Sequence, residues 1–414
     1  MTKLEAMLKY VSEHNDFYKK RIKEYGITNP LDITQWPVLT RKELQENRYN
    51  MFSDGYKAKY FNQQLRRQSS SGSSGVPVNV YWDYKDWYAS NKILWKKRLD
   101  WYGIYPNDRY VIFTLNAFNV QNESESVFYR IDPQNILTVN VSLIQKESAY
   151  ERLIDIIDKF NPKWFYIQPF VLNKLIKTYI RTNKKTPKAI AYIETVGELL
   201  SPELRQKAIE FFDVPLANMY GSEEMNSIAY ECPKHHMHLL NDNIYVNSNN
   251  CEQAGLLSNK KSIIITNLLN KAMPLINYDQ GDIVAFDKLK SICPYDKNDT
   301  IISLIKGRIY ECIRINECYE LNPTMLLEIM AETINQYGDI ILSYQFIYEQ
   351  SRQTLVCLIE TSKYNYKWFP NIKKSIEFSY LMKVPSNIDV LFKVKHQYNH
   401  TTQCQKQKII EIIQ

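Results

Sequence analysis

The strongest constraint on the fold is an alternation of strand-like and helix-like segments through the first half of the chain. Aromatic or β-branched runs, which favour strands, are separated by stretches with helical spacing. Such alternation predicts an α/β fold with a mainly parallel sheet. The expected segments are a strand at Asn79–Trp82, a helix near Trp87–Trp101, and strands at Tyr110–Leu115, Trp164–Ile167, Ala189–Val196, Leu216–Tyr220, Ser262–Asn267 and Ile283–Phe286.

The pattern changes near Arg308, and the remaining hundred or so residues predict a compact α+β unit. We therefore expect two domains, a large N-terminal domain over residues 1–307 and a small, mobile C-terminal domain over residues 308–414. The expected C-terminal elements are a helix at Pro323–Gln336, strands at Ile340–Tyr348 and Thr354–Glu360, a helix after Tyr366 and a strand at Ile388–Lys395.

Composition indicates a folded protein of a reducing compartment. Hydrophobic residues make up 44% and charged residues 23% of the 414 residues, which is ordinary for globular proteins. Leu4, Met7, Leu8 and Val11 have helical spacing interrupted by charges, which indicates an amphipathic helix and not a signal peptide. No apolar run reaches membrane-spanning length, and seven scattered Cys do not suggest a disulfide framework. We expect a cytoplasmic protein that does not bind a membrane.

The formal net charge of +7 is concentrated near the C-terminus. Residues 351–414 contain ten Lys or Arg and four acidic residues, a net charge of +6. A solvated lysine-rich face and an anion-binding surface explain this equally well. Because no nucleic-acid-reading motif accompanies the charge, we do not expect a nucleic-acid partner.

A serine- and glycine-rich run precedes the first expected strand. Its hydroxyl and backbone donors could surround polyphosphate oxygens, with glycine allowing close approach. Most such runs are flexible loops, but two closely spaced Gly in a chain with only 11 indicate a requirement of the backbone. The candidate phosphate-binding residues are Ser70, Ser71, Gly72, Ser73, Ser74 and Gly75.

Four further glycines, Gly197, Gly221, Gly281 and Gly307, follow apolar runs and adjoin acids, hydroxyls or Arg. They occur in "VGELLSPE", "NMYGSEE", "NYDQGD" and "KGR". With the phosphate loop, their order and spacing resemble the signature of the acyl-adenylate-forming superfamily, especially phenylacetate–CoA ligases and their capsule-biosynthesis relatives. The resemblance extends from "WPVLTRKEL" almost to the last residues.

This resemblance implies an ATP- and Mg²⁺-dependent enzyme and assigns its binding residues. The serine-rich loop would hold the β- and γ-phosphates. Glu224, the last residue of a motif that begins with Tyr220-Gly221-Ser222, would bind Mg²⁺. Gly197, Glu198 and Tyr220 would frame adenine, and Asp282 would bind the ribose hydroxyls with Arg308 nearby. Lys406 in "TTQCQKQKII" would be the catalytic lysine that reaches the α-phosphate, with Lys408 as its rival.

The sequence also departs from the superfamily pattern. Val76 replaces a frequent phosphate-loop Lys, and Asn277 and Asp279 stand where related chains often carry Arg. Arg66, Arg67 or Mg²⁺ would then have to balance phosphate charge. Near Glu317 the sequence lacks the glycine expected where the small domain meets the thiol substrate, so adenylation is better supported than thioester formation.

A second candidate site combines thiol and imidazole side chains. Cys232, His235, His236 and His238 lie within seven residues, and Cys293 stands where some relatives begin a zinc-binding Cys-x-Cys, although Tyr295 replaces its second Cys. A structural zinc bound by Cys232, His238 and Cys293 and a buried Cys beside surface histidines are both compatible with this pattern.

The predicted function is acid–thiol ligation in two steps, adenylation of a small, aromatic carboxylic acid and transfer to a thiol. The segment Leu115 to Ser124 would contribute to the acid pocket, and dihydroxybenzoate of siderophore biosynthesis is one candidate acid. The basic C-terminal region favours a phosphopantetheine carrier protein over free coenzyme A as acceptor. A non-catalytic nucleotide-binding protein is the alternative from another class.

Overall fold

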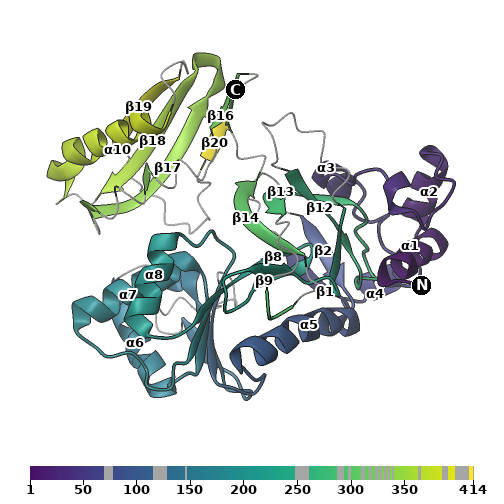
Figure 1. Ribbon diagram of the computed structural model, residues 1–414, viewed down its shortest axis with the longest axis horizontal. Helices are drawn as coiled ribbons and strands as arrows, with labels where there is room; N and C mark the ends of the chain where they lie inside the picture. Colours follow the sequence, from purple (N-terminus) through teal and green to yellow (C-terminus); the bar gives the residue numbers. More distant parts are fainter. Residues whose placement is uncertain are drawn as a thin grey trace.

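In the residues that it describes, the computed structural model has one large sheet and three smaller ones (Figure 1). It describes residues 1–69, 78–114, 128–144, 147–247, 261–286, 293–296, 300–308, 313–316, 319–321, 326, 329–330, 333, 336–337, 340–361, 365–384, 390–396 and 410–413. Twelve strands form the large sheet in the order β11-β12-β13-β14-β10-β9-β8-β7-β6-β3-β5-β4. A four-stranded sheet in the order β19-β18-β17-β20 lies in the C-terminal region.

The described α-helices are α1 (Lys3–His14), α2 (Asp16–Glu24), α3 (Arg41–Glu46), α4 (Tyr56–Phe61), α5 (Tyr84–Tyr102), α6 (Glu147–Phe160), α7 (Pro169–Thr182), α8 (Pro202–Phe212) and α10 (Phe369–Lys383). Side-chain caps fix several of their starts. Thr2 with Glu5, and Thr40 with Glu43, form capping boxes at α1 and α3. Among the helices described, none is long and apolar enough to span a membrane.

The described strands of the large sheet are β3 (Tyr110–Thr114), β4 (Tyr129–Ile131), β5 (Ile136–Asn140), β6 (Trp164–Ile167), β7 (Tyr192–Val196), β8 (Leu216–Ser222), β9 (Asn226–Glu231), β10 (Met237–Leu239), β11 (Ile244–Asn247), β12 (Lys261–Asn267), β13 (Tyr278–Phe286) and β14 (Ile301–Arg308). The smaller sheets contain β1 (Arg66–Ser69), β2 (Asn79–Trp82), β15 (Ile313–Asn316), β16 (Tyr319–Leu321), β17 (Ile341–Glu349), β18 (Thr354–Thr361), β19 (Leu391–His396) and β20 (Ile410–Ile413).

The α/β fold class expected from the sequence is confirmed, and the structure refines the expected strand directions. Five neighbouring strands, β5-β3-β6-β7-β8, run parallel. From β8 to β11 every neighbouring pair is antiparallel. A short turn joins β8 to β9 and another joins β9 to β10, whereas the parallel neighbours β6, β7 and β8 are joined by crossovers that contain helices.

Three main cores support these sheets. One packs β3, β5, β6 and β7 against α6, α7 and α8, which gather at one end of the large sheet in Figure 1. Another packs the N-terminal helices against β12 and β13. A third contains only residues from Ile313 onward and covers the four-stranded sheet with α10. Along the chain, β14 is the last described strand of the large sheet, and it ends at Arg308. The division into domains at 307/308 stays a prediction.

A buried ion pair joins α5 to the centre of the large sheet. Arg98 Nε and Nη2 donate to Glu194 Oε2 and Oε1 at 2.8 and 2.5 Å. Arg98 is 5% exposed and Glu194 is fully buried. Tyr230 Oη also donates to Glu194 Oε2 at 3.1 Å, so both carboxylate oxygens accept hydrogen bonds. These hydrogen bonds offset the free energy that is lost when the two charges are removed from water.

We expect Arg98→Met to lower the free energy of unfolding by about 3–5 kcal/mol, because Glu194 would be left buried without its cation. The exposed pair between Arg181 and Glu151 provides the control, since Arg181→Met should change stability by less than about 1 kcal/mol. Urea denaturation followed by tryptophan fluorescence measures both. Similar losses in the two variants would contradict the importance assigned to the buried pair.

Candidate functional site

The predicted adenine-binding residues lie at the carboxyl ends of two parallel neighbours. Val196, the last residue of β7, pairs in register with Met219 of β8. Gly197 therefore leaves the sheet beside Tyr220. This edge is where open α/β sheets bind their ligands, because the loops that follow parallel strands converge there.

Two of the glycines meet distinct backbone requirements. Gly197 has φ +78°, a left-handed conformation that L-residues with a side chain rarely adopt. At Gly221 the limit is space, because an added Cβ would lie 2.4 Å from the backbone oxygen of Asn226. A register shift in the β8–β9 pairing occurs at the same position. Glycine thus shapes both turns at this edge.

Tyr220 and Asp282 contact each other although 62 residues separate them in the sequence. Tyr220 Oη donates a hydrogen bond of 2.5 Å to Asp282 Oδ2. Asp282 also pairs in register with Arg308 across β13 and β14. The structure therefore brings together three residues predicted for adenine, ribose and their surroundings.

Glu198 and Ser222 contact their local surroundings. Glu198 is exposed, and its Oε2 accepts from the backbone N–H of Phe170 at 3.2 Å, in the first turn of α7. A carboxylate there is favoured by the helix dipole. Ser222 Oγ donates to Gln280 Oε1 and accepts from the Met225 N–H, both at 3.2 Å. Their predicted contacts with adenine and nucleotide stay predictions.

Glu224, the predicted Mg²⁺ ligand, is a buried carboxylate of which one oxygen accepts hydrogen bonds and the other has no partner among the described residues. Its exposure is 1%, and Oε1 accepts from Arg41 Nη1 at 3.1 Å and from Tyr278 Oη at 3.5 Å. Among the described residues, Oε2 has no hydrogen-bond partner. Since a buried carboxylate oxygen needs a donor or a cation, the donor set fits a hard divalent ion such as Mg²⁺.

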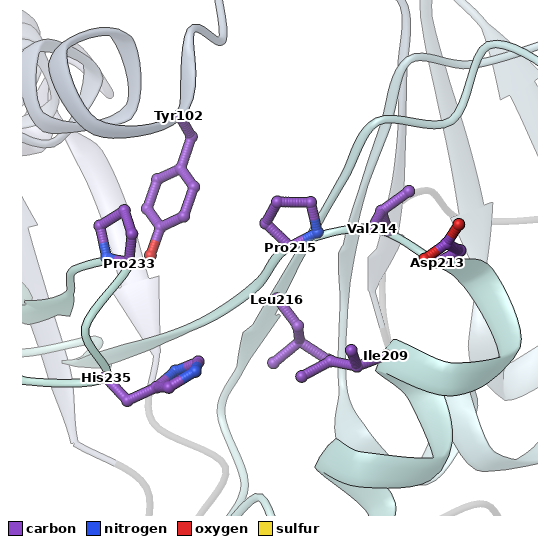
Figure 2. A pocket seen from close by; sticks show the side chains of 8 residues that line it. All are labelled: Tyr102, Ile209, Asp213, Val214, Pro215, Leu216, Pro233 and His235. Carbon is purple, nitrogen blue, oxygen red and sulfur yellow. The ribbon is translucent and has the colours of Figure 1, made fainter.

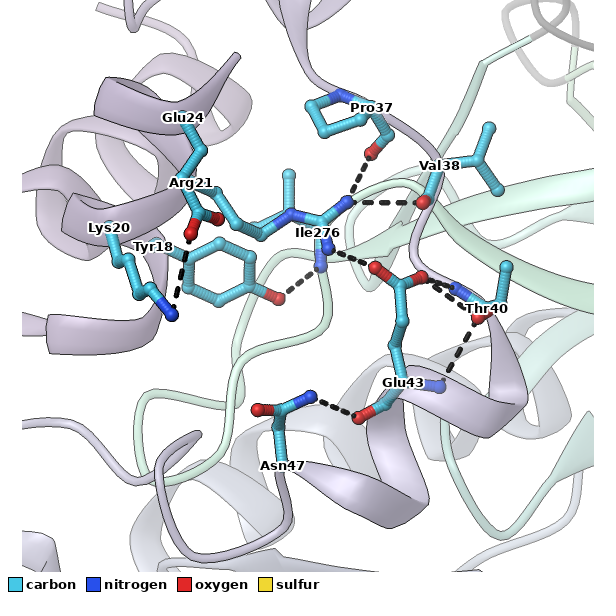
Figure 3. Close-up of polar contacts among 10 residues, drawn as sticks. All are labelled: Tyr18, Lys20, Arg21, Glu24, Pro37, Val38, Thr40, Glu43, Asn47 and Ile276. Carbon is cyan, nitrogen blue, oxygen red and sulfur yellow. Dashed lines mark hydrogen bonds and ion pairs between the residues drawn. The ribbon is translucent and has the colours of Figure 1, made fainter.

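Arg41 was not predicted as a site residue, and a set of contacts from Arg21 holds its helix in place (Figure 3). Arg21 donates from Nη1 to Glu43 Oε1 at 2.6 Å, and from Nη2 to the backbone oxygens of Pro37 and Val38 at 3.3 and 3.1 Å. Glu43 also caps α3, which begins at Arg41. One buried guanidinium thus fixes both the entry to α3 and its first turn.

The same segment is attached to the large sheet. The Leu39 N–H donates to the backbone oxygen of Asn277, and the Asp279 N–H donates to the backbone oxygen of Leu39, both at 2.9 Å. These bonds place Arg41 beside Glu224, which lies 183 residues further along the chain. The sequence signal for Arg41 was present in "WPVLTRKEL", as an arginine directly after a helix cap.

The residues at the atypical positions have structural partners. Asn277 is buried, and its Nδ2 donates to the backbone oxygens of Ile33 and Trp36 at 3.2 and 2.9 Å. Asp279 Oδ1 accepts from Ser262 Oγ at 2.6 Å and from the Gly281 N–H at 2.8 Å. Asn277 therefore holds the N-terminal segment in position.

The two arginines proposed to balance phosphate charge lie in β1. Arg66 is stacked on the Trp87 ring, with its guanidinium carbon 4.0 Å from the ring centroid. Arg67 Nε donates to Asn79 Oδ1 at 3.0 Å. Arg41 is the arginine that the structure places in direct contact with Glu224.

A second cluster lies at the opposite end of β8 and β9. Ligand atoms of Cys232, His236, His238 and Cys293 all lie within 4.8 Å of one another, and the two sulfurs are 3.6 Å apart. Burial raises the pKa of the Cys232 thiol to about 11 and lowers that of His238 to about 4. Two thiols and two imidazoles form a donor set that fits tetrahedral zinc.

A cavity of about 380 Å³ lies on this side of the sheet (Figure 2). It is mostly apolar and lies where β8 begins, away from Tyr220 and Glu224. It therefore does not belong to the predicted nucleotide site. Its lining residues are Tyr102, Ile209, Asp213, Val214, Pro215, Leu216, Pro233 and His235.

Several predicted residues lie outside the described part of the chain. They are the phosphate-loop residues Ser70, Ser71, Gly72, Ser73, Ser74 and Gly75 with Val76, the acid-pocket segment from Leu115 to Ser124, Glu317, and Lys406 with Lys408. For Gly307 and Arg308 the structure describes the backbone alone. These assignments stay predictions.

Comparison with known proteins gives no match to a protein-family model and none to a curated protein by sequence. Solved structures do match. A 2-hydroxyisobutyryl-CoA ligase in the postadenylation state, in complex with 2-HIB-AMP, superposes with TM-score 0.69 at 16% identity, covering 99% of this chain and 88% of that one.

Two further structures show the same likeness over a smaller share of their length. The O-succinylbenzoate coenzyme A synthetase of Bacillus subtilis, in complex with AMP, gives TM-score 0.55 at 13% identity, covering 83% of this chain and 67% of that one. A benzoate CoA ligase from Burkholderia xenovorans LB400 gives TM-score 0.51 at 11% identity, covering 84% and 67%. The chain therefore has the fold of the acyl- and aryl-CoA ligases of the adenylate-forming superfamily.

Proposed function

We propose that the protein is an ATP-dependent acid–thiol ligase that forms an acyl-adenylate. The observation that carries the proposal is the hydrogen bond between Tyr220 and Asp282, with the buried carboxylate of Glu224 in the turn that follows β8, within the fold of acid–CoA ligases. Two half-reactions follow. A carboxylate oxygen attacks the α-phosphorus and the bond to pyrophosphate breaks, and then a thiolate attacks the acyl carbon and AMP leaves.

Each residue of the edge has a defined task in this proposal. Gly197, Glu198 and Tyr220 frame adenine, and Asp282 accepts hydrogen bonds from the ribose hydroxyls. The hydrogen bond from Tyr220 orients the Asp282 carboxylate for this task. The nucleotide is also bordered by Gly221, Ser222 and Arg308. Residues 70–75 bind its β- and γ-phosphates.

Glu224 is the proposed Mg²⁺ ligand through Oε2, the oxygen without a partner among the described residues. A Mg²⁺ held by Glu224 would supply positive charge against the phosphates of ATP. Arg41 keeps the other oxygen paired with a cation although the carboxylate is buried. The arginine thus orients Glu224 and limits the energy needed to bury its charge.

Lys406 is the proposed catalytic lysine. Its ammonium group would approach the α-phosphate and stabilise the charge that develops there during the attack. The C-terminal domain, residues 308–414, would carry it in and out of the site by rotation near Arg308, so that one arrangement serves adenylation and another admits the thiol.

The substrate is proposed to be a small aromatic acid, with dihydroxybenzoate as one candidate. An ATP–pyrophosphate exchange assay over aryl and short acyl acids tests both the acid and the reaction. Absence of exchange with every acid would favour a non-catalytic nucleotide-binding protein.

Structural zinc is proposed for the cluster containing Cys232, His238 and Cys293. The cluster lies at the end of β9 that is distant from Glu224, since β8 and β9 pair antiparallel between Met219–Tyr230 and Ser222–Asn226. Zinc there would support the fold and take no part in acyl transfer.

Glu224→Gln is expected to slow ATP–pyrophosphate exchange at least 100-fold, because it removes a charge from the metal site while preserving shape. Glu210→Gln, the same change on the exposed surface of α8, is the control and should keep the parental rate. Equal exchange rates in the Glu224 variant and the parent would remove Glu224 from the mechanism.

Lys406→Ala is expected to slow acyl-AMP formation by about 100-fold or more, while transfer from preformed acyl-AMP to a thiol continues, because its charge acts only in the first half-reaction. Separate assays of the two half-reactions measure this. Lys408→Ala is the matched comparison two residues away. A defect in Lys408→Ala alone would reassign the role, and equal loss of both half-reactions would indicate a folding defect.

Coenzyme A is the acceptor that we expect to react more efficiently, because solved neighbours include a CoA ligase bound to it. A carrier protein is the second candidate, favoured by the net charge of +6 over residues 351–414. Transfer to each acceptor is compared at low and high salt. A faster reaction with the carrier that weakens as salt rises would reverse the assignment, since salt screens attraction to an acidic surface.

A further inference from the structure

The zinc cluster has one more ligand than the sequence indicates. Three ligands were identified by sequence, and Tyr295 occupies the position where a further Cys would complete the set. The ligand atom of a fourth side chain, that of His236, lies within the same 4.8 Å as those of Cys232, His238 and Cys293. Four protein ligands are what a closed structural zinc site requires.

The turn between Cys232 and His236 explains why His236 and not His235 faces the cluster. The His235 N–H donates to the Cys232 oxygen at 2.8 Å, and the Cys232 N–H donates to the His236 oxygen at 2.9 Å. His235 has φ +60°, a left-handed conformation at the tip of the turn. The reversal returns His236 toward Cys232.

The two neighbouring histidines consequently have different surroundings. The His235 side chain is 54% exposed, lies 3.2 Å from Arg205 and 3.5 Å from Glu231, and lines the cavity in Figure 2. His236 Nδ1 is buried and has no hydrogen-bond partner among the described residues. A buried ring nitrogen of this kind is suited to a metal.

The cluster also joins segments that are distant in the sequence. Cys232 follows β9, His238 lies in β10, and Cys293 belongs to the segment 293–296 that precedes β14. Helix α5 covers them with Trp101, whose ring centroid lies 5.2 Å from that of His238.

Contacts from α5 continue on both sides of Trp101. The Trp101 ring stacks on Tyr230 at 5.7 Å with an interplanar angle of 7°. Lys97 Nζ lies 4.7 Å from the centroid of Trp101 and 2.6 Å from Asp296 Oδ2. Trp101 is therefore an intrinsic probe in direct contact with the cluster and with the segment that carries Cys293.

We propose that His236 is the fourth ligand of a closed Cys₂His₂ zinc site, and that the bound metal fastens segment 293–296 to β9, β10 and α5 beneath Trp101. This inference rests on the structural zinc proposed above and not on the ligase activity. Binding converts two thiols to thiolates and releases their protons to solvent.

The first experiment measures zinc content and affinity in the full-length protein. The parent should contain about one zinc, and His236→Ala should bind it at least about 100-fold more weakly in competition with a chromogenic chelator, more than a change outside the coordination shell would cause. His235→Ala is the matched control and should retain the parental affinity. A parent that neither contains nor takes up zinc would refute the site.

Cobalt substitution then identifies the ligands, because tetrahedral Co²⁺ bound to thiolates has characteristic visible and charge-transfer bands. His236→Ala should alter these bands, and His236→Cys should restore tight binding with a stronger thiolate band, which excludes a simple folding defect. Zinc removal should change Trp101 fluorescence in the parent, with Trp101→Phe as the reference. Unchanged zinc affinity and cobalt spectra in His236→Ala would overturn the assignment of His236.

Because these readouts do not use ATP, they stay informative if the protein fails to catalyse pyrophosphate exchange. Failure of exchange with intact zinc binding would reject the ligase proposal alone. Absence of zinc binding together with normal pyrophosphate exchange would reject the zinc site alone.

Discussion

The ion pair between Arg98 and Glu194 is the interaction on which the organisation of the large sheet most depends. It links the longest N-terminal helix, α5, to β7, and Tyr230 adds β9 to the same carboxylate. Burying two charges is unfavourable unless both are fully hydrogen bonded, so these partners must be placed together. The pair therefore fixes how α5 crosses β7 and β9.

Two sites depend on this crossing. Glu194 lies three residues before Gly197, which directly follows the end of β7 at the proposed adenine pocket. Tyr230, on the other side of the pair, stacks on Trp101 above the thiol and imidazole cluster. The proposed nucleotide site and the proposed zinc cluster thus lie on opposite sides of one buried polar network.

The sequence was sufficient for much of the regular structure. Residues 79–82 and 164–167 have the expected strand limits, and the strand expected at 354–360 extends by one residue. Local pattern suffices here because strand-forming runs are bounded by turns or by helices with clear caps. The antiparallel half of the sheet was not distinguished, since strand direction depends on pairing between distant segments.

Side-chain contacts between distant segments were the least predictable part of the site. Arg41 meets Glu224 across 183 residues, and Arg98 meets Glu194 across 96. No periodicity in the sequence encodes such a meeting. The difference between His235 and His236 was likewise hidden, because it follows from the left-handed backbone of a single residue in a turn. The order of the motifs predicted the candidate site, and tertiary packing determined which charges lie beside Glu224.

The uncharged residue Asn277 helps to place the positive charge of Arg41 beside Glu224. The sequence resemblance led us to expect Arg at this position, but here a buried amide donates to the backbone oxygens of Ile33 and Trp36. The backbone oxygen of Asn277 also accepts from the Leu39 N–H. These three bonds hold the segment that leads into α3.

Arg41 begins that helix and reaches Glu224. The uncharged amide of Asn277 therefore anchors a segment that brings a cation to Glu224. This positive charge comes from the N-terminal segment, and its position depends on the hydrogen bonds that Asn277 makes with the backbone of that segment. An isosteric amide-to-carboxylate change at Asn277 would remove a donor to two backbone oxygens and place a buried anion against them, so its effect on Glu224 would act through the placement of Arg41.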